Sequence, residues 1–269
     1  MLDTPVLQFM SHKGGRLAYR ETGAGHALFL LHGMNGSSQS WAYLFQALGT
    51  SFRVVAWDAP GFGASDAFGD GIEDYVEAAK ALLTALEVND AILVGHSMGG
   101  VVAAQLAADR DTSAAGLVLS STHLGFGRPK GEPLMARYGT RVDRIRSEGV
   151  NAAYGLERAS RSTPEGTSQT VIRFLADIAA GARIEGIRDG GRMCQETDNT
   201  KISHDVNVPV LILSGGEDTV ISPEMHALLV AAFPKAQHVE CPNAGHASYA
   251  EYPDFFNEQI KEFATKARR

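Results

Sequence analysis

The chain has 269 residues, which is enough for one large α/β domain or a domain with an insertion. Its net charge of −7 argues against non-specific nucleic-acid binding, and no apolar run is long enough to span a membrane. Two cysteines far apart in the sequence and the absence of a signal-peptide core near residue 1 predict a cytoplasmic protein with free thiols. The oligomeric state stays open, a homo-oligomer included.

Strands and helices alternate along most of the chain. The predicted strands span residues 6–10, 16–20, 27–31, 52–57, 91–94, 116–120, 210–214 and 237–241. The predicted helices span about 40–48, 72–86, 101–108, 223–233 and 253–265. The first two strands form an antiparallel hairpin at a sheet edge, whereas wholly apolar runs such as Ala27–Leu31 are typical of central parallel strands. The pattern predicts an α/β fold with a mostly parallel sheet flanked by helices.

Residues 122–207 interrupt this alternation, because they contain no convincing strand. Helical stretches are expected at about 133–147, 150–160, 167–180 and 184–196. We interpret the interval as a mostly helical cap inserted into a core domain made of residues 1–121 and 208–269. Ligands of open α/β sheets bind at the carboxyl ends of the strands, so a cap there would cover the site. The alternative is a second domain with no role in the site.

Positive charge collects in this interval, which carries 11 Arg and 2 Lys against 11 Asp and Glu. Arg137, Arg141 and Arg144 have the spacing of one helix face. Because a guanidinium binds a carboxylate with two parallel hydrogen bonds, this face is a candidate site for an anionic substrate. A solvated outer face is the more ordinary interpretation.

A Gly-x-Ser-x-Gly sequence, Gly95 to Gly99, lies between an apolar strand and a helical run. A serine on such a strand-to-helix turn has a strained backbone and an exposed hydroxyl. The small residues on either side avoid collisions with the strand and the helix. Ser97 is therefore the candidate nucleophile.

A serine hydroxyl needs a base, and the base needs a carboxylate that holds its tautomer. His246 follows the last predicted strand and is the candidate base. Asp218 follows the preceding strand and is the candidate acid, with its neighbour Glu217 as the alternative. The chain order Ser, Asp, His is the one that this kind of turn uses.

Acyl transfer also needs donors for the developing oxyanion. The backbone N–H of Met98, directly after the nucleophile, is one candidate, and that of Met34, in the loop after the third strand, is the other. Three further side chains are candidates for lining the acyl pocket: Asn35, Trp41 and Phe62.

The remaining histidines have no ligand-like spacing, and no Cys/His cluster fits a zinc site. His96 is expected to pack beneath the serine turn, and His32 to shape the loop that follows the third strand. No Gly-x-Gly-x-x-Gly or Walker-type loop is present either. We therefore expect no metal and no nucleotide cofactor.

These motifs resemble those of α/β-hydrolase fold enzymes over nearly the whole chain. The residues that carry the resemblance are His32-Gly33, Asp58-x-Pro60-Gly61-x-Gly63-x-Ser65, Gly95 to Gly100, Asp218 and Gly245-His246. The cap segment 144–150 is also similar to that of enol-lactone hydrolases of the 3-oxoadipate pathway. Ala247-Ser248-Tyr249 after the histidine departs from the related C–C hydrolases, which usually have a tryptophan there. A serine nucleophile argues against haloalkane dehalogenases and epoxide hydrolases.

The resemblance implies a serine hydrolase of a small carboxylic ester or lactone that works through an acyl-enzyme. One alternative is a C–C bond hydrolase of a vinylogous diketone. The other is a non-catalytic small-molecule receptor on the same fold.

Overall fold

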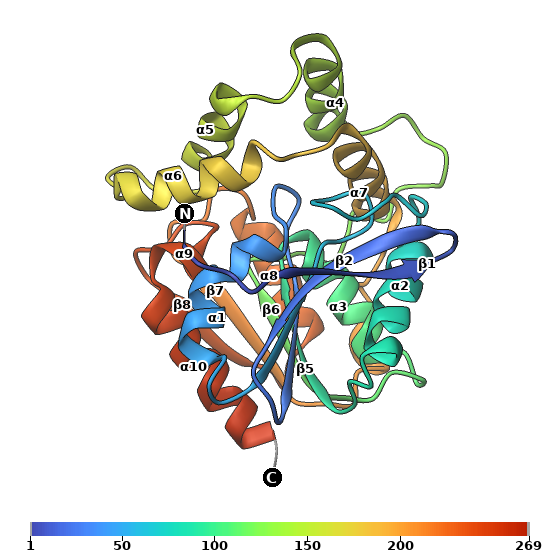
Figure 1. The fold of residues 1–269 in the computed structure, drawn as a ribbon, viewed down its shortest axis with the longest axis vertical. Coiled ribbons are helices and arrows are strands. Elements are labelled where there is room, and N and C mark those ends of the chain that lie inside the picture. Colours follow the sequence, from blue (N-terminus) through green and yellow to red (C-terminus); the bar gives the residue numbers. More distant parts are fainter. Residues whose placement is uncertain (1, 268–269) are drawn as a thin grey trace.

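An eight-stranded sheet forms the centre of the computed structural model, which describes residues 2–267 (Figure 1). Its strand order is β1-β2-β4-β3-β5-β6-β7-β8. The strands are β1 (Leu7–His12), β2 (Gly15–Thr22), β3 (Ala27–Leu31), β4 (Arg53–Trp57), β5 (Ala91–His96), β6 (Ala114–Ser120), β7 (Val210–Gly215) and β8 (Gln237–Cys241). β1 with β2 and β2 with β4 pair antiparallel, and the other pairs are parallel. The predicted edge hairpin and parallel sheet are thus both present.

Helices cover both faces of the sheet because its central strands are buried on both sides. In β3, Leu28 and Leu30 belong to one apolar cluster and Phe29 and Leu31 to the other. The first cluster lies under α1 (Ala42–Leu48) and α10 (Pro253–Ala267), and the second under α2 (Ile72–Ala85), α3 (Met98–Ala108) and α8 (Pro223–Ala232). Three short helical turns complete the set of helices outside α4–α7: η1 (Ser38–Trp41), η2 (Ile202–His204) and α9 (Ser248–Glu251).

Four helices follow β6 before the chain returns to the sheet at β7. They are α4 (Ala136–Glu148), α5 (Ala152–Ser160), α6 (Gln169–Ala179) and α7 (Ile184–Glu196). In Figure 1, α4, α5 and α6 lie at the top, beyond the ends of the strands. Within residues 2–267, no helix is both long and apolar enough to cross a membrane. The division of the chain into core and cap domains stays a prediction.

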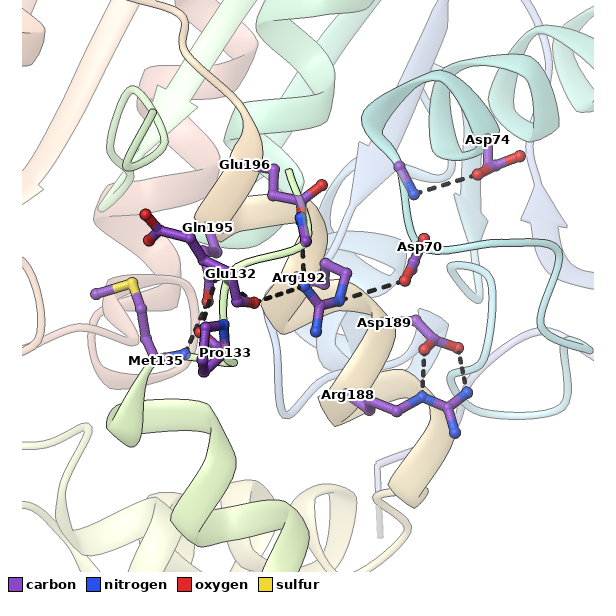
Figure 2. Close-up of polar contacts among 12 residues, drawn as sticks. Asp70, Asp74, Glu132, Pro133, Met135, Arg188, Asp189, Arg192, Gln195 and Glu196 are labelled. Carbon is purple, nitrogen blue, oxygen red and sulfur yellow. Dashed lines mark hydrogen bonds and ion pairs between the residues drawn. The ribbon is translucent and has the colours of Figure 1, made fainter. Parts of the chain in front are cut away.

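The first of these helices begins at Ala136, about three residues later than the sequence suggested. Side chains of α7 form hydrogen bonds with the backbone of the residues just before α4, as Figure 2 shows. The Gln195 amide donates to the Pro133 carbonyl at 3.2 Å, and its oxygen accepts from the Met135 N–H at 2.7 Å. Arg192 donates to the Glu132 carbonyl at 3.0 Å. These contacts hold the segment extended, and a helical start at residue 133 would remove them.

Arg192 also connects α7 to the segment just before α2, because its Nε lies 3.4 Å from the Asp70 carboxylate (Figure 2). Two glycines bring α7 still closer. A Cβ on Gly186 would lie 2.7 Å from the Gly61 carbonyl oxygen, and one on Gly190 would lie 2.8 Å from Met98 Sδ. The helix therefore packs directly on the loop after β4 and on the first residue of α3.

We expect Gly186→Ala to reduce stability by about 1–3 kcal/mol, because the new methyl group must push α7 away from the backbone at Gly61. Gly139→Ala in α4 is the matched control, since its Cβ would lie 3.4 Å from the nearest atom. There the gain in helix propensity predicts unchanged or higher stability. Thermal unfolding of the two variants measures the difference, and equal midpoints would contradict this account of how α7 packs.

Candidate active site

A cavity of about 660 Å³ lies between the carboxyl ends of the parallel strands and the helices that follow β6. The loops after five strands reach it, with Met34 after β3, Ser97 after β5, His123 after β6, Val220 after β7 and His246 after β8. From the helices, it is lined by Arg137, Tyr138, Arg141, Arg144, Tyr154, Glu157, Arg158, Leu175 and Ile178. The sheet therefore supplies one wall and α4, α5 and α6 the other.

Ser97 stands on a strained turn between β5 and α3, with φ 52° and ψ −119°. A side chain in this region is disfavoured, so the surrounding packing must hold it. Both flanking glycines are needed. A Cβ on Gly99 would lie 2.1 Å from the Leu31 carbonyl oxygen, and one on Gly95 would lie 2.5 Å from the Gly100 Cα. His96 and Met98 are buried whereas Ser97 is half-buried, so the turn presents the serine to the cavity.

His246 and Asp218 form a buried pair, with His246 Nδ1 2.9 Å from Asp218 Oδ2. The other carboxylate oxygen accepts from the N–H groups of Val220 and Ile221 at 2.8 and 3.1 Å. Burial disfavours the ionised carboxyl, but His246 and these two amides outweigh it and lower the pKa of Asp218. The alternative acid Glu217 has an exposed side chain and makes no contact with His246 among the described residues.

The backbone around His246 is hydrogen-bonded on all sides. Its N–H donates to the Ser162 carbonyl at 2.8 Å, and its carbonyl lies 2.9 Å from His96 Nε2. The amides of Gly245 and Ala247 both donate to the Glu251 carboxylate, at 3.0 and 2.9 Å. Burial and the nearby His246 lower the pKa of His96 to about 3, so the ring is neutral and its Nε2–H is the donor.

His32 shapes the loop that carries Met34. Its Nε2 accepts from the Ala59 N–H at 3.0 Å, which leaves the ring hydrogen on Nδ1 to donate to the Gly33 carbonyl at 2.8 Å. Burial lowers the pKa of His32, in keeping with this neutral form. Met34 and Met98, whose N–H groups are the candidate oxyanion donors, both line the cavity beside Ser97.

Of the three other predicted pocket residues, the structure brings only Asn35 to the cavity, where its side-chain oxygen accepts from Arg141. Trp41 and Phe62 are 1 % exposed and do not line it, so those two assignments are corrected. The Trp41 ring packs on Tyr249 at 5.4 Å between centroids, and the Phe62 ring packs edge-on against His32 at 5.3 Å. Trp41 therefore packs on a residue that lines the cavity, and Phe62 packs on the histidine that shapes the loop of Met34.

The predicted arginine face does point into the cavity, but its three members have different surroundings. Arg137 lies over the rings of Phe126 and Tyr138. Arg144 pairs with Glu157, and with Glu148 at 3.0 Å. Arg141 donates to Asn35 and, at 3.0 Å, to the Tyr154 hydroxyl.

Sequence reasoning missed Arg158, which lines the same cavity with a side chain only 13 % exposed. It also missed Glu251, His123 and Tyr154. Nothing in their local sequence separates these residues from surface or core positions, because their roles depend on contacts between distant segments. Within residues 2–267, no group of three or more His, Cys, Asp or Glu side chains is placed to hold a metal ion.

A model of the alpha/beta hydrolase family matches residues 28–259. The chain belongs to this family. The resemblance drawn from the sequence motifs and the predicted fold class are thereby confirmed. The matched range includes both Ser97 and the His246–Asp218 pair.

Several known proteins are similar to this chain over nearly its full length. The enol-lactonase of Burkholderia xenovorans LB400 is 25% identical with a TM-score of 0.84, covering 96% of this chain and 100% of that one. A thermophilic esterase from Thermogutta terrifontis is 27% identical with a TM-score of 0.83, covering 97% of each chain. The pimeloyl-[acyl-carrier protein] methyl ester esterase of Pectobacterium carotovorum is 27% identical over 92% of this chain and 98% of its own. These relatives support hydrolase activity on this fold.

We expect Glu251→Ala to lower kcat for a chromogenic ester by about 10- to 100-fold, because the amides on both sides of His246 lose their acceptor and the imidazole loses its position. KM should change much less, since Glu251 does not line the cavity. Glu258→Ala on α10 is the control, because that side chain is exposed. Equal kcat values for the two variants would show that the loop keeps its place without Glu251.

Proposed function

We propose that this protein hydrolyses a small carboxylic ester or lactone through an acyl-enzyme on Ser97. The observation that carries the proposal is the buried His246–Asp218 pair, which opens on the same cavity as a serine with a positive φ. A carboxylate on Nδ1 leaves Nε2 of the neutral imidazole free to accept a proton. The esterases and the lactonase among the relatives support this reaction class.

In the first half-reaction, His246 Nε2 takes the hydroxyl proton as Ser97 Oγ bonds to the substrate carbonyl carbon. The carbonyl oxygen becomes an oxyanion, which accepts hydrogen bonds from the N–H groups of Met34 and Met98. The intermediate then breaks its bond to the alcohol or enol oxygen, which receives the proton from His246. In the second half, water repeats the attack, with His246 as base, and releases the acid and Ser97.

We expect Ser97→Ala to remove at least three orders of magnitude of turnover while the protein stays folded, because the residue supplies the nucleophile from a half-buried turn. Hydrolysis of a chromogenic short-chain ester measures the loss, and mass spectrometry of the unaltered protein should detect the acyl group on Ser97. A folded variant with more than a few per cent of activity would exclude Ser97 as the nucleophile. Binding without turnover by the unaltered protein would favour a receptor.

The neighbouring carboxylates of Asp218 and Glu217 allow the identity of the catalytic acid to be tested with a matched control. Asp218→Asn should cut kcat by roughly 10⁴-fold, since an amide stabilises the wrong imidazole tautomer. Glu217→Gln should leave kcat within about 2-fold, because Glu217 points to solvent. The reverse result would show that Glu217, and not Asp218, is the catalytic acid.

We further propose that the substrate carries a carboxylate, which binds Arg141 and Arg158. Among the described residues no carboxylate lies within 4.0 Å of Arg141, and its Nε is buried without a hydrogen-bond partner. Arg158 pairs with Glu157 at 2.5 Å, but Glu157 is shared with Arg144 and Arg161. Burial and the charge of Arg141 together lower the pKa of Arg158. Positive charge is therefore in excess in this part of the cavity, and an anion would offset it.

We expect Arg141→Ala and Arg158→Ala to lower kcat/KM for anionic substrates by about 10- to 100-fold, which is what losing one charge-assisted hydrogen bond costs. The probes are monomethyl esters of dicarboxylic acids with four to eight carbons, each compared with the methyl ester of the monocarboxylic acid of equal length. Neutral esters should lose less than about 3-fold. Arg146→Ala is the control, because Arg146 lies on the same helix as Arg141 but is exposed and pairs with Asp143. Equal losses for charged and neutral esters would mean that the arginines only support the helices.

A further inference from the structure

The imidazole of His123 is a polar group in the cavity that the proposed reaction does not use. It follows β6, the strand next to β5, so it lies beside the serine turn. The preceding residue ties the two loops together, because the Thr122 hydroxyl donates to the Ser97 carbonyl. His123 is buried yet lines the same cavity as Ser97.

The hydrogen bonds of His123 settle which ring nitrogen carries the hydrogen. The Gly125 N–H donates to Nδ1 at 2.9 Å, so Nδ1 is the acceptor. In a neutral imidazole the hydrogen must then be on Nε2. The pKa of His123 is lowered to about 3, mainly by burial and to a smaller extent by the charges of Arg137 and His246. The ring is therefore neutral at working pH.

The Nε2–H of His123 has no hydrogen-bond partner among residues 2–267. Packing against the Phe126 ring, 4.8 Å away between centroids, holds the imidazole in place together with the bond from Gly125. A fixed, neutral donor on the wall of a cavity is suited to recognise an acceptor atom of a ligand, since it adds no charge and does not reorganise on binding.

We propose that His123 determines substrate specificity by donating a hydrogen bond from Nε2 to a carbonyl-type oxygen of the substrate other than that of the scissile group. The proposal rests on the hydrolysis proposed above and narrows its substrates to esters or lactones that bear a second, oxo-type acceptor. His123 only donates a hydrogen bond in this proposal, and its Nε2 keeps the proton throughout the reaction.

A purely structural role for His123, as the acceptor that holds the Gly125 turn, is the competing explanation. Two substitutions separate the roles. In His123→Asn the side-chain oxygen takes the place of Nδ1 and still accepts from Gly125, but the donor at Nε2 is lost. In His123→Gln the amide nitrogen reaches the place of Nε2, so the donor is kept.

The experiment measures kcat/KM for methyl heptanoate and its 3-, 4-, 5- and 6-oxo derivatives. Butyl acetate compared with 2-oxobutyl and 3-oxobutyl acetate covers an acceptor on the alcohol side. We expect the unaltered protein to prefer at least one oxo ester over its methylene counterpart by about 10-fold. That ratio should fall to within about 2-fold of unity in His123→Asn and return in His123→Gln. The parent esters, which lack the oxo group, should lose much less kcat/KM in His123→Asn than the preferred oxo ester does.

Three results would overturn the proposal. The unaltered protein could show no preference for any oxo ester, the preference could survive in His123→Asn, or all esters could lose activity equally in both variants. Failure of the proposed hydrolysis would be seen separately, as no turnover of any ester. In that case calorimetric binding of the same oxo and parent esters to Ser97→Ala and to Ser97→Ala/His123→Asn tests the hydrogen bond by itself.

Discussion

The hydrogen-bonded backbone of the loop at His246 is the constraint on which the site depends. The imidazole can reach both Asp218 and the serine turn only if the loop after β8 stays in one conformation. The His246 amide donates to the Ser162 carbonyl, in the loop after α5, and the His246 carbonyl accepts from His96, beside the nucleophile. Glu251 accepts from the amides on either side. One loop thus joins the helices after β6, the serine turn and the C-terminal part of the chain.

The helices after β6 therefore contact the residues of the site in addition to lining the cavity. Ser162 comes from the loop after α5, and a Cβ on Gly245 would lie 2.7 Å from Pro164, so that loop presses directly on the histidine loop. On the other side, α7 packs against Met98 at Gly190. A displacement of these helices would therefore disturb the base and the nucleophile together, in addition to opening the cavity.

The same helices determine the electrostatics of the cavity. Arginines on a free helix would be solvated, and their charges would be screened. Here Arg141 and Arg158 line one cavity, the charge of Arg141 lowers the pKa of Arg158, and Glu157 is shared among several arginines. Opposite them, the sheet contributes neutral imidazoles at His96 and His123, which burial keeps uncharged. The cavity thus has a cationic wall and a neutral, hydrogen-bonding wall.

The sequence by itself determined the sheet, the helices and the positions of Ser97, Asp218 and His246. Strands buried on both faces read as apolar runs, and the carboxyl ends of parallel strands meet at one edge, so residues just after them are brought together. Only the tertiary structure decided that Arg158 faces the cavity while Trp41 does not. The direction of a side chain depends on how helices from distant segments pack, and no local periodicity encodes that packing.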